Sequence, residues 1–194
     1  MKKSYLLLIT LILLVFISGI TGWVIHEVKE DYSCSSEIKS DSIEIKTLND
    51  RNYFPAVLDL IRNAKNRIDL IMFTFKFYEN NNSKTMQIAN ELISAKKRGV
   101  KVRVIVDDSE FLDNVASDNA KMAGYLQTYG IEVRMDDRRK TLHSKVWIID
   151  DYVVLGSHNL VYYALEHNNE ASIVVKSEAL AEEYENYFEF LWKK

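Results

Sequence analysis

The feature that most constrains how this chain folds is an apolar segment at residues 5–25, which carries no charged side chain. About 20 apolar residues in a helix are enough to cross the hydrocarbon core of a bilayer. Lys2 and Lys3 precede the segment, and this placement favours a cytoplasmic amino terminus with the rest of the chain outside. We therefore predict a transmembrane anchor or signal segment at residues 1–26. An uncleaved anchor is favoured, and a secreted protein follows if the segment is cleaved.

The next segment, residues 27–42, is rich in serine and mixed charges and has no sustained hydrophobic period, so we interpret it as a polar linker. It contains Cys34, the only cysteine of the chain. A single cysteine excludes an intramolecular disulfide and a metal site built from several cysteines. A free thiol is the favoured interpretation of Cys34, and a disulfide between two copies of the linker is the alternative.

The remaining residues, 43–194, alternate between strand-like and helix-like patterns. Apolar or alternating runs predict strands at residues 42–46, 67–75, 101–106, 131–135, 146–149, 152–155 and 171–175. Helical spacing of apolar residues predicts helices at 53–66, 85–98, 118–129 and 178–192, with Ser83 as an amino-terminal cap. Strands that alternate with helices indicate an α/β layered domain with a mixed sheet flanked by helices.

The side chains that can carry chemistry begin at His143. Lys145 follows two residues later at the start of a predicted strand, and the strand period of two places both side chains on one face. An ammonium group beside an imidazole disfavours protonation of the imidazole and attracts an anion. Ser157 and Asn159 repeat the two-residue spacing, and Gly156 permits close backbone approach. We predict that Lys145, Ser157 and Asn159 bind a phosphate and that His143 is the nucleophile.

This pattern resembles the HKD signature of the phospholipase D superfamily, in which H-x-K is followed by four residues and D, and later by G-S-x-N. The matching positions are His143, Lys145, Asp150, Gly156, Ser157 and Asn159. Five residues separate Asp150 from Gly156, where six are common in the family, which predicts a shortened hairpin turn at Asp150. The resemblance extends over most of residues 43–194, which we interpret as a phospholipase D-like catalytic domain.

The resemblance implies a mechanism in which two HKD motifs meet. One histidine attacks phosphorus and forms a phosphohistidine, while the other protonates the leaving oxygen and then activates water. Lys145 and Asn159 would stabilise the phosphate charge, Glu170 would orient the histidine ring, and Asp150 and Gly156 would be structural. No metal and no cofactor is required. Because the chain has one motif, the resemblance implies a homodimer that shares the active site across its two-fold axis.

The substrate is left open between two classes of phosphodiester. Arg134, Arg138, Arg139 and Lys140 approach His143 along the sequence. A metal-independent, nonspecific endonuclease is favoured, because the run from Arg138 to Lys140 suits a polyanion. The formal net charge of -3 gives no wider basic footprint. A phospholipase D that acts on phospholipid head groups is the alternative, and an inactive scaffold is a minor one. We expect His158 to be structural. Asp107 and Asp108 follow the end of a predicted strand, and we interpret them as helix-capping or rim residues and not as metal ligands.

Overall fold

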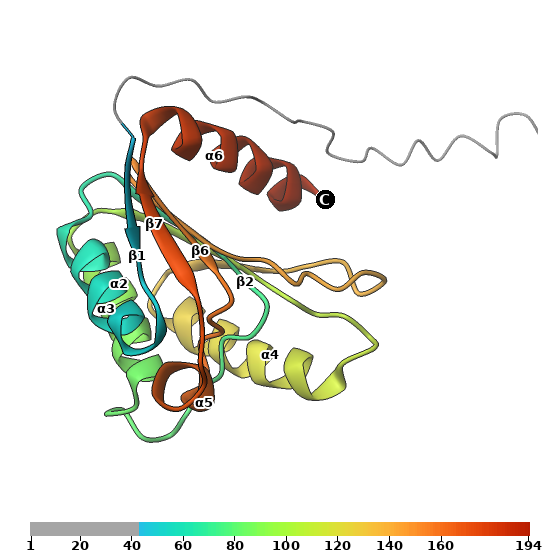
Figure 1. Cartoon of the computed structure of the whole chain (residues 1–194). Coiled ribbons are helices and arrows are strands. Elements are labelled where there is room, and N and C mark those ends of the chain that lie inside the picture. Colours follow the sequence, from blue (N-terminus) through green and yellow to red (C-terminus); the bar gives the residue numbers. More distant parts are fainter. Residues whose placement is uncertain (1–42) are drawn as a thin grey trace, which may run out of the picture. The chain divides into compact units, whose positions relative to one another are not determined.

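The computed structural model describes residues 43–194, so the predicted anchor, the linker and Cys34 lie outside the described residues. Its sheet has the strand order β1-β7-β6-β5-β2-β3-β4 (Figure 1). The strands are β1 (Glu44–Thr47), β2 (Arg67–Met72), β3 (Lys101–Val106), β4 (Glu132–Met135), β5 (Lys145–Ile149), β6 (Tyr152–Gly156) and β7 (Ser172–Lys176). The helices are η1 (Asp50–Asn52), α2 (Tyr53–Asn63), α3 (Lys84–Lys97), α4 (Asp113–Thr128), α5 (Tyr162–Glu166) and α6 (Glu178–Lys193). None of these helices has the length and apolar character needed to cross a bilayer.

The sheet is mixed, as predicted. Strands β2, β3 and β4 are parallel, whereas β5 pairs antiparallel with β2 and with β6. Met72 at the end of β2 pairs with Lys145 at the start of β5, and Gly156 at the end of β6 pairs with Ser172 at the start of β7. The ends of β2, β3 and β6 and the starts of β5 and β7 therefore lie along one border of the sheet, which we call the carboxyl edge.

Helices cover both faces of the sheet (Figure 1). Helices α2, α3 and α4 pack on one face against alternate strand residues such as Leu70, Val104 and Trp147. Helix α6 packs on the other face, against the intervening residues such as Ile71 and Ile105. The central strands therefore bury both faces, which explains why their sequences are almost continuously apolar.

Three arginines from neighbouring strands fix α6 to the sheet. Arg103 of β3 donates to Asp69 of β2 at 2.8 Å and to Glu189 of α6 at 2.6 Å. Arg67 of β2 pairs with Glu185 of α6, and Arg134 of β4 donates to the carbonyl oxygen of Trp192. We had grouped Arg134 with the basic residues that approach His143. This placement was wrong, because Arg134 lies on β4 and its guanidinium contacts α6.

Most predicted elements are confirmed within a few residues, and two of the α-helices differ from the prediction. Helix α4 begins at Asp113, five residues before the predicted start at 118. Helix α5 was not predicted at all, because five residues are too few to show a helical period. The capping prediction is confirmed, since the Ser83 hydroxyl accepts a hydrogen bond from the Met86 amide at 3.3 Å.

Candidate active site

His143 and Lys145 lie at the carboxyl edge and both contact the ring of Phe73, which follows β2. The ring centroids of His143 and Phe73 are 4.6 Å apart, and the Lys145 ammonium lies 4.8 Å from the Phe73 centroid. His143 precedes β5 and is exposed, whereas Lys145 begins β5 and is 9% exposed. The shared contact with Phe73 places the two side chains on the same side of the chain, as the period of two predicts.

Lys145 is a buried cation without a carboxylate partner. Its ammonium donates to the carbonyl oxygen of His143 at 2.7 Å, and among residues 43–194 it forms no ion pair. Burial lowers the pKa of Lys145, and the negative charge of Glu170 offsets this effect only in part. A desolvated ammonium gains free energy from a bound anion, so this position suits a phosphate oxygen.

The predicted phosphate ligand Ser157 lies where β6 and β7 approach very closely. A Cβ atom on Gly156 would lie 2.5 Å from the Ser172 Cα, so no other residue fits there without moving β7. The Ser157 amide donates to the Ala171 carbonyl at 2.9 Å, and the Ala171 amide donates to the Ser157 hydroxyl oxygen at 3.1 Å. The backbone therefore fixes the position of Ser157 relative to the segment that carries Glu170.

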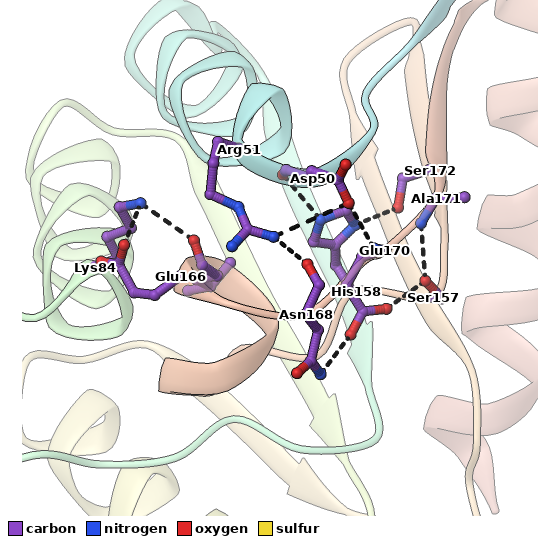
Figure 2. A network of polar contacts seen from close by, with 11 residues as sticks. Asp50, Arg51, Lys84, Ser157, His158, Glu166, Asn168, Glu170, Ala171 and Ser172 are labelled. Carbon is purple, nitrogen blue, oxygen red and sulfur yellow. Dashed lines mark hydrogen bonds and ion pairs between the residues drawn. The ribbon is translucent and has the colours of Figure 1, made fainter.

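Glu170 accepts hydrogen bonds from the Ser157 hydroxyl and from the Asn168 side chain, the latter at 3.1 Å (Figure 2). Its backbone amide donates to the Asp50 carboxylate at 2.8 Å. The hydrogen bonds of the described residues do not include one between Glu170 and His143. The predicted orienting role of Glu170 therefore stays a prediction, and in this arrangement the Ser157 hydroxyl donates to Glu170.

Asn159 lies just beyond β6 and is half-buried. Its side-chain oxygen is shielded from solvent and has no hydrogen-bond partner among residues 43–194. A buried amide oxygen without a donor costs free energy, so such groups call for an explanation. The Asn159 amide oxygen therefore has hydrogen-bonding capacity that the described residues leave unused.

His158 has a structural role, as expected. Its ring is buried and stacks on Tyr53 with centroids 4.0 Å apart. Its Nε2 lies 3.1 Å from the Asp50 carbonyl oxygen and its Nδ1 lies 2.8 Å from the Ser172 hydroxyl (Figure 2). Because a carbonyl only accepts, Nε2 carries the proton and Nδ1 accepts from Ser172. Burial lowers the pKa of His158, which keeps the ring neutral.

Asp150 lies away from this edge, in the turn between β5 and β6. Its carboxylate accepts hydrogen bonds from the amides of Lys65, Asn66 and Arg67 at 2.8–3.0 Å. Its backbone adopts a φ of 51°, in the left-handed region that aspartate tolerates better than most residues. Asp150 therefore joins the β5–β6 turn to the segment that enters β2.

Two buried polar residues for which the sequence predicted no role at the site support the positions of His143 and Phe73. Asp107 is fully buried, and its carboxylate accepts the Leu142 amide at 2.7 Å, one residue before His143. Asn119 of α4 donates to the carbonyl oxygens of Phe73 and Asp107, both at 2.8 Å. We had interpreted Asp107 as a capping or rim residue. Its position directly after a buried strand was the only feature of the sequence that could have indicated this supporting role.

The basic residues before His143 are exposed, and part of their charge is neutralised. Arg139 pairs with Asp137 at 2.9 Å, and these hydrogen bonds lower the pKa of Asp137 to about 2. Arg138 and Lys140 extend from the same exposed loop. Within residues 43–194, no three histidine, cysteine or acidic side chains gather as a group that could hold a metal ion.

The sequence of the chain is similar to a family model and to several known proteins. Residues 57–192 match the family model described as "Cardiolipin synthase, PLD-like domain". The chain is 30% identical over 142 residues to the mitochondrial cardiolipin hydrolase of Xenopus tropicalis, covering 73% of this chain and 61% of that protein. It is 28% identical over 153 residues to the 5'-3' exonuclease PLD3 of Xenopus tropicalis, covering 72% of this chain and 30% of that protein.

A solved structure supports the same relationship. The phospholipase D family member Nuc from Salmonella typhimurium superposes with a TM-score of 0.66 at 25% identity, covering 78% of this chain and 95% of that one. The chain spans 61% and 30% of the two curated relatives described above.

Proposed function

Since the chain belongs to the phospholipase D superfamily through its PLD-like domain, we propose that it is a phosphodiesterase that works through a phosphohistidine on His143. The observation that carries this proposal is the buried Lys145 ammonium beside His143, which has no carboxylate partner among the described residues. A cation left unpaired in this way suits a site whose counter-charge arrives with the substrate.

In the proposed first step, a nitrogen of His143 forms a bond to phosphorus as the bond from phosphorus to the leaving oxygen breaks. The leaving oxygen takes a proton from a second histidine. Lys145 and the Asn159 amide group stabilise the charge on the phosphoryl oxygens. In the second step, water gives a proton to that second histidine and attacks phosphorus. The bond from phosphorus to His143 breaks, which releases a phosphomonoester and restores the enzyme.

The second histidine is proposed to be His143 of another copy of the chain, in a homodimer whose active site lies across the two-fold axis. The single motif of this chain supports the proposal, and so does the unpartnered oxygen of Asn159. The dimer also gives Glu170 a role: it would orient the histidine ring once the site is assembled. If residues 1–26 anchor each copy in one membrane, their effective concentration rises.

The proposed substrate is nucleic acid, cleaved without a metal and without sequence specificity. The exposed Arg138 and Lys140 at the carboxyl edge support a polyanionic substrate. Phospholipid is the second candidate, because a relative that matches most of this domain is named a cardiolipin hydrolase.

The experiment is an assay of the full-length chain in EDTA on single-stranded DNA, plasmid, RNA, phosphatidylcholine and cardiolipin. We expect nucleic-acid cleavage that His143→Asn abolishes, and an acid-labile phosphate on the protein during turnover. Lipid turnover alone would favour the phospholipase. Inactivity on every substrate would favour an inactive scaffold.

The dimer has its own measurement. Specific activity should fall when the chain is diluted below its dissociation constant, in step with the dimer fraction from sedimentation. A monomer that retains full activity would disprove the shared site.

A further inference from the structure

Three exposed rings gather on α5 and at its carboxyl end, in the segment that follows the predicted phosphate ligand Asn159. We call them the aromatic cluster: Tyr162, Tyr163 and His167. Tyr162 and Tyr163 are 46% and 67% exposed. The rings of Tyr162 and Tyr163 meet edge to face at 5.5 Å, and that of His167 lies 5.0 Å from Tyr162. Exposed aromatic groups of this size mark binding surfaces more often than isolated exposed residues do.

The aromatic cluster is held in place. The Tyr162 hydroxyl and the His167 Nε2 are 2.9 Å apart, and the Tyr162 amide donates to the Tyr78 hydroxyl at 3.0 Å. Helix α5 is fixed to α3 by an ion pair of 2.8 Å between Lys84 and Glu166 (Figure 2). A stacking surface that is already ordered loses little entropy on binding.

A pocket of about 280 Å³ adjoins the aromatic cluster. Tyr78 and Tyr162 line it together with Asn80, Asn82, Lys84 and Glu166. Lys84 and Glu166 neutralise each other there, so the pocket offers no net charge for a phosphate. Its phenol and amide groups can donate and accept hydrogen bonds. Aromatic walls with neutral hydrogen-bonding groups suit a nucleobase, which stacks and carries donors and acceptors.

We propose that the aromatic cluster and this pocket hold a nucleobase of a single-stranded substrate, next to the phosphate bound at Lys145 and Asn159. The inference rests on the proposed nuclease function and specifies its substrate. Both features lie at the carboxyl edge, since the pocket is built from the segment after β2 and from the helix after β6. A duplex keeps its bases stacked inside, so the proposal predicts a preference for single strands.

The test removes the stacking rings from the protein and, separately, the stacking bases from the oligonucleotide. The double variant Tyr162→Ala with Tyr163→Ala of the full-length chain loses both rings, while the backbone hydrogen bonds of Tyr162 and Tyr163 remain. A single-stranded oligonucleotide is compared with the same oligonucleotide carrying abasic residues around the cleavage position. Tyr129→Ala is the matched control, because Tyr129 is 47% exposed and follows α4 far from this edge.

We expect the double variant to raise KM for the normal oligonucleotide roughly tenfold, because base stacking on an aromatic ring contributes about that much. In the unchanged protein, the abasic oligonucleotide should show a similarly raised KM. The double variant should not raise it further, since the two changes remove the same contact. The control variant should match the unchanged protein on both substrates.

Equal losses on both oligonucleotides, or loss of the dimer in sedimentation, would overturn the proposal and assign the tyrosines to the fold or to a protein interface. An unchanged KM on both would also overturn it. If the unchanged protein cleaves no nucleic acid, the nuclease function fails first. Fluorescence anisotropy of a labelled oligonucleotide on His143→Asn then decides the binding site: weaker binding after the tyrosine substitutions supports it, and equal binding overturns it.

Discussion

Arg103 and Lys145 are both buried cations in the same sheet, yet their surroundings differ. Arg103, 4% exposed, pairs with two carboxylates and lies 4.6 Å from the Phe188 ring. Burial lowers the pKa of Arg103, but its hydrogen bonds with Asp69 and Glu189 outweigh burial and raise it. For Lys145 burial prevails, and the pKa is lowered.

The difference separates a structural charge from a functional one. Around Arg103 the chain supplies both counter-charges, and the result joins β2, β3 and α6. Around Lys145 the described residues supply a carbonyl oxygen, an aromatic ring and the charge of Glu170, with which Lys145 forms no ion pair. A fold that keeps such a cation at the start of β5 retains an unfavourable charge that an anionic ligand relieves.

The largest expected effect in this comparison is on stability. Arg103→Met should lower the free energy of unfolding by about 3–5 kcal/mol, because Asp69 is left buried and unpaired. Urea unfolding measures the change, and the folded fraction should keep its activity. Adding Asp69→Leu should recover part of the loss, since no buried charge remains. Equal stability in Arg103→Met and the unchanged protein would contradict the structural assignment.

Lys145→Met should have the opposite effects to Arg103→Met, with a loss of activity and no loss of stability. We expect kcat to fall roughly 10²–10³-fold, because the charge that stabilises the transferring phosphoryl group is lost. Thermal stability should be equal or higher, since a desolvated, unpaired charge is removed. Lys176→Met is the control, because that lysine is 44% exposed on β7 of the same sheet. A strong loss of stability with Lys145→Met would show that the two cations serve the same purpose.

Substitution of Asp107 tests whether the region around Lys145 also depends on a buried hydrogen bond, the one from the Leu142 amide to Asp107. Asp107→Ala removes the acceptor of the Leu142 amide, so His143 should move from its attacking position. We expect kcat to fall roughly 10- to 100-fold with little change in KM. Asp107→Asn keeps an oxygen acceptor and should restore most of the rate. If the alanine variant alters KM alone, Asp107 does not position the nucleophile.

The smallest expected effect is on the pH dependence of stability, and it concerns the buried His158. Burial lowers the pKa of His158 in the folded state, so the unfolded chain binds the extra proton first. Stability is then fully present above the ordinary histidine pKa of about 6.5 and is lost as the pH falls below it. Urea unfolding between mildly alkaline and mildly acidic pH measures the slope. His158→Gln should flatten the curve, and an unchanged curve would show that other groups titrate.

Much of the fold could be predicted because most of its helices and strands have a recognisable hydrophobic pattern within their own residues. The prediction of a strand at residues 101–106 has the observed bounds, since a run of six residues rich in valine and isoleucine, between turn signals, is too short for a helix. Helix α5 gave no such signal. The start of α4 was placed too late because residues 113–117 are mostly polar and expose little hydrophobic period.

The site shows the same division. His143, Lys145, Ser157 and Asn159 could be proposed because they follow a known spacing within a short window. Asp107 and Asn119 could not, since their contacts join segments that are distant in the sequence. One signal was overlooked: β2 and β3 each place one charge in the middle of an apolar run, and Asp69 and Arg103 have opposite signs.

The near-contact at Gly156 has a consequence for how this domain can diverge. The space beside it admits a hydrogen atom and nothing larger, so the spacing between Ser157 and the segment that carries Glu170 is set by two backbones. Substitution of side chains cannot tune that spacing gradually. New substrate preferences must therefore arise in the surrounding segments, such as α5, which carries Tyr162, and the loop that carries Arg138.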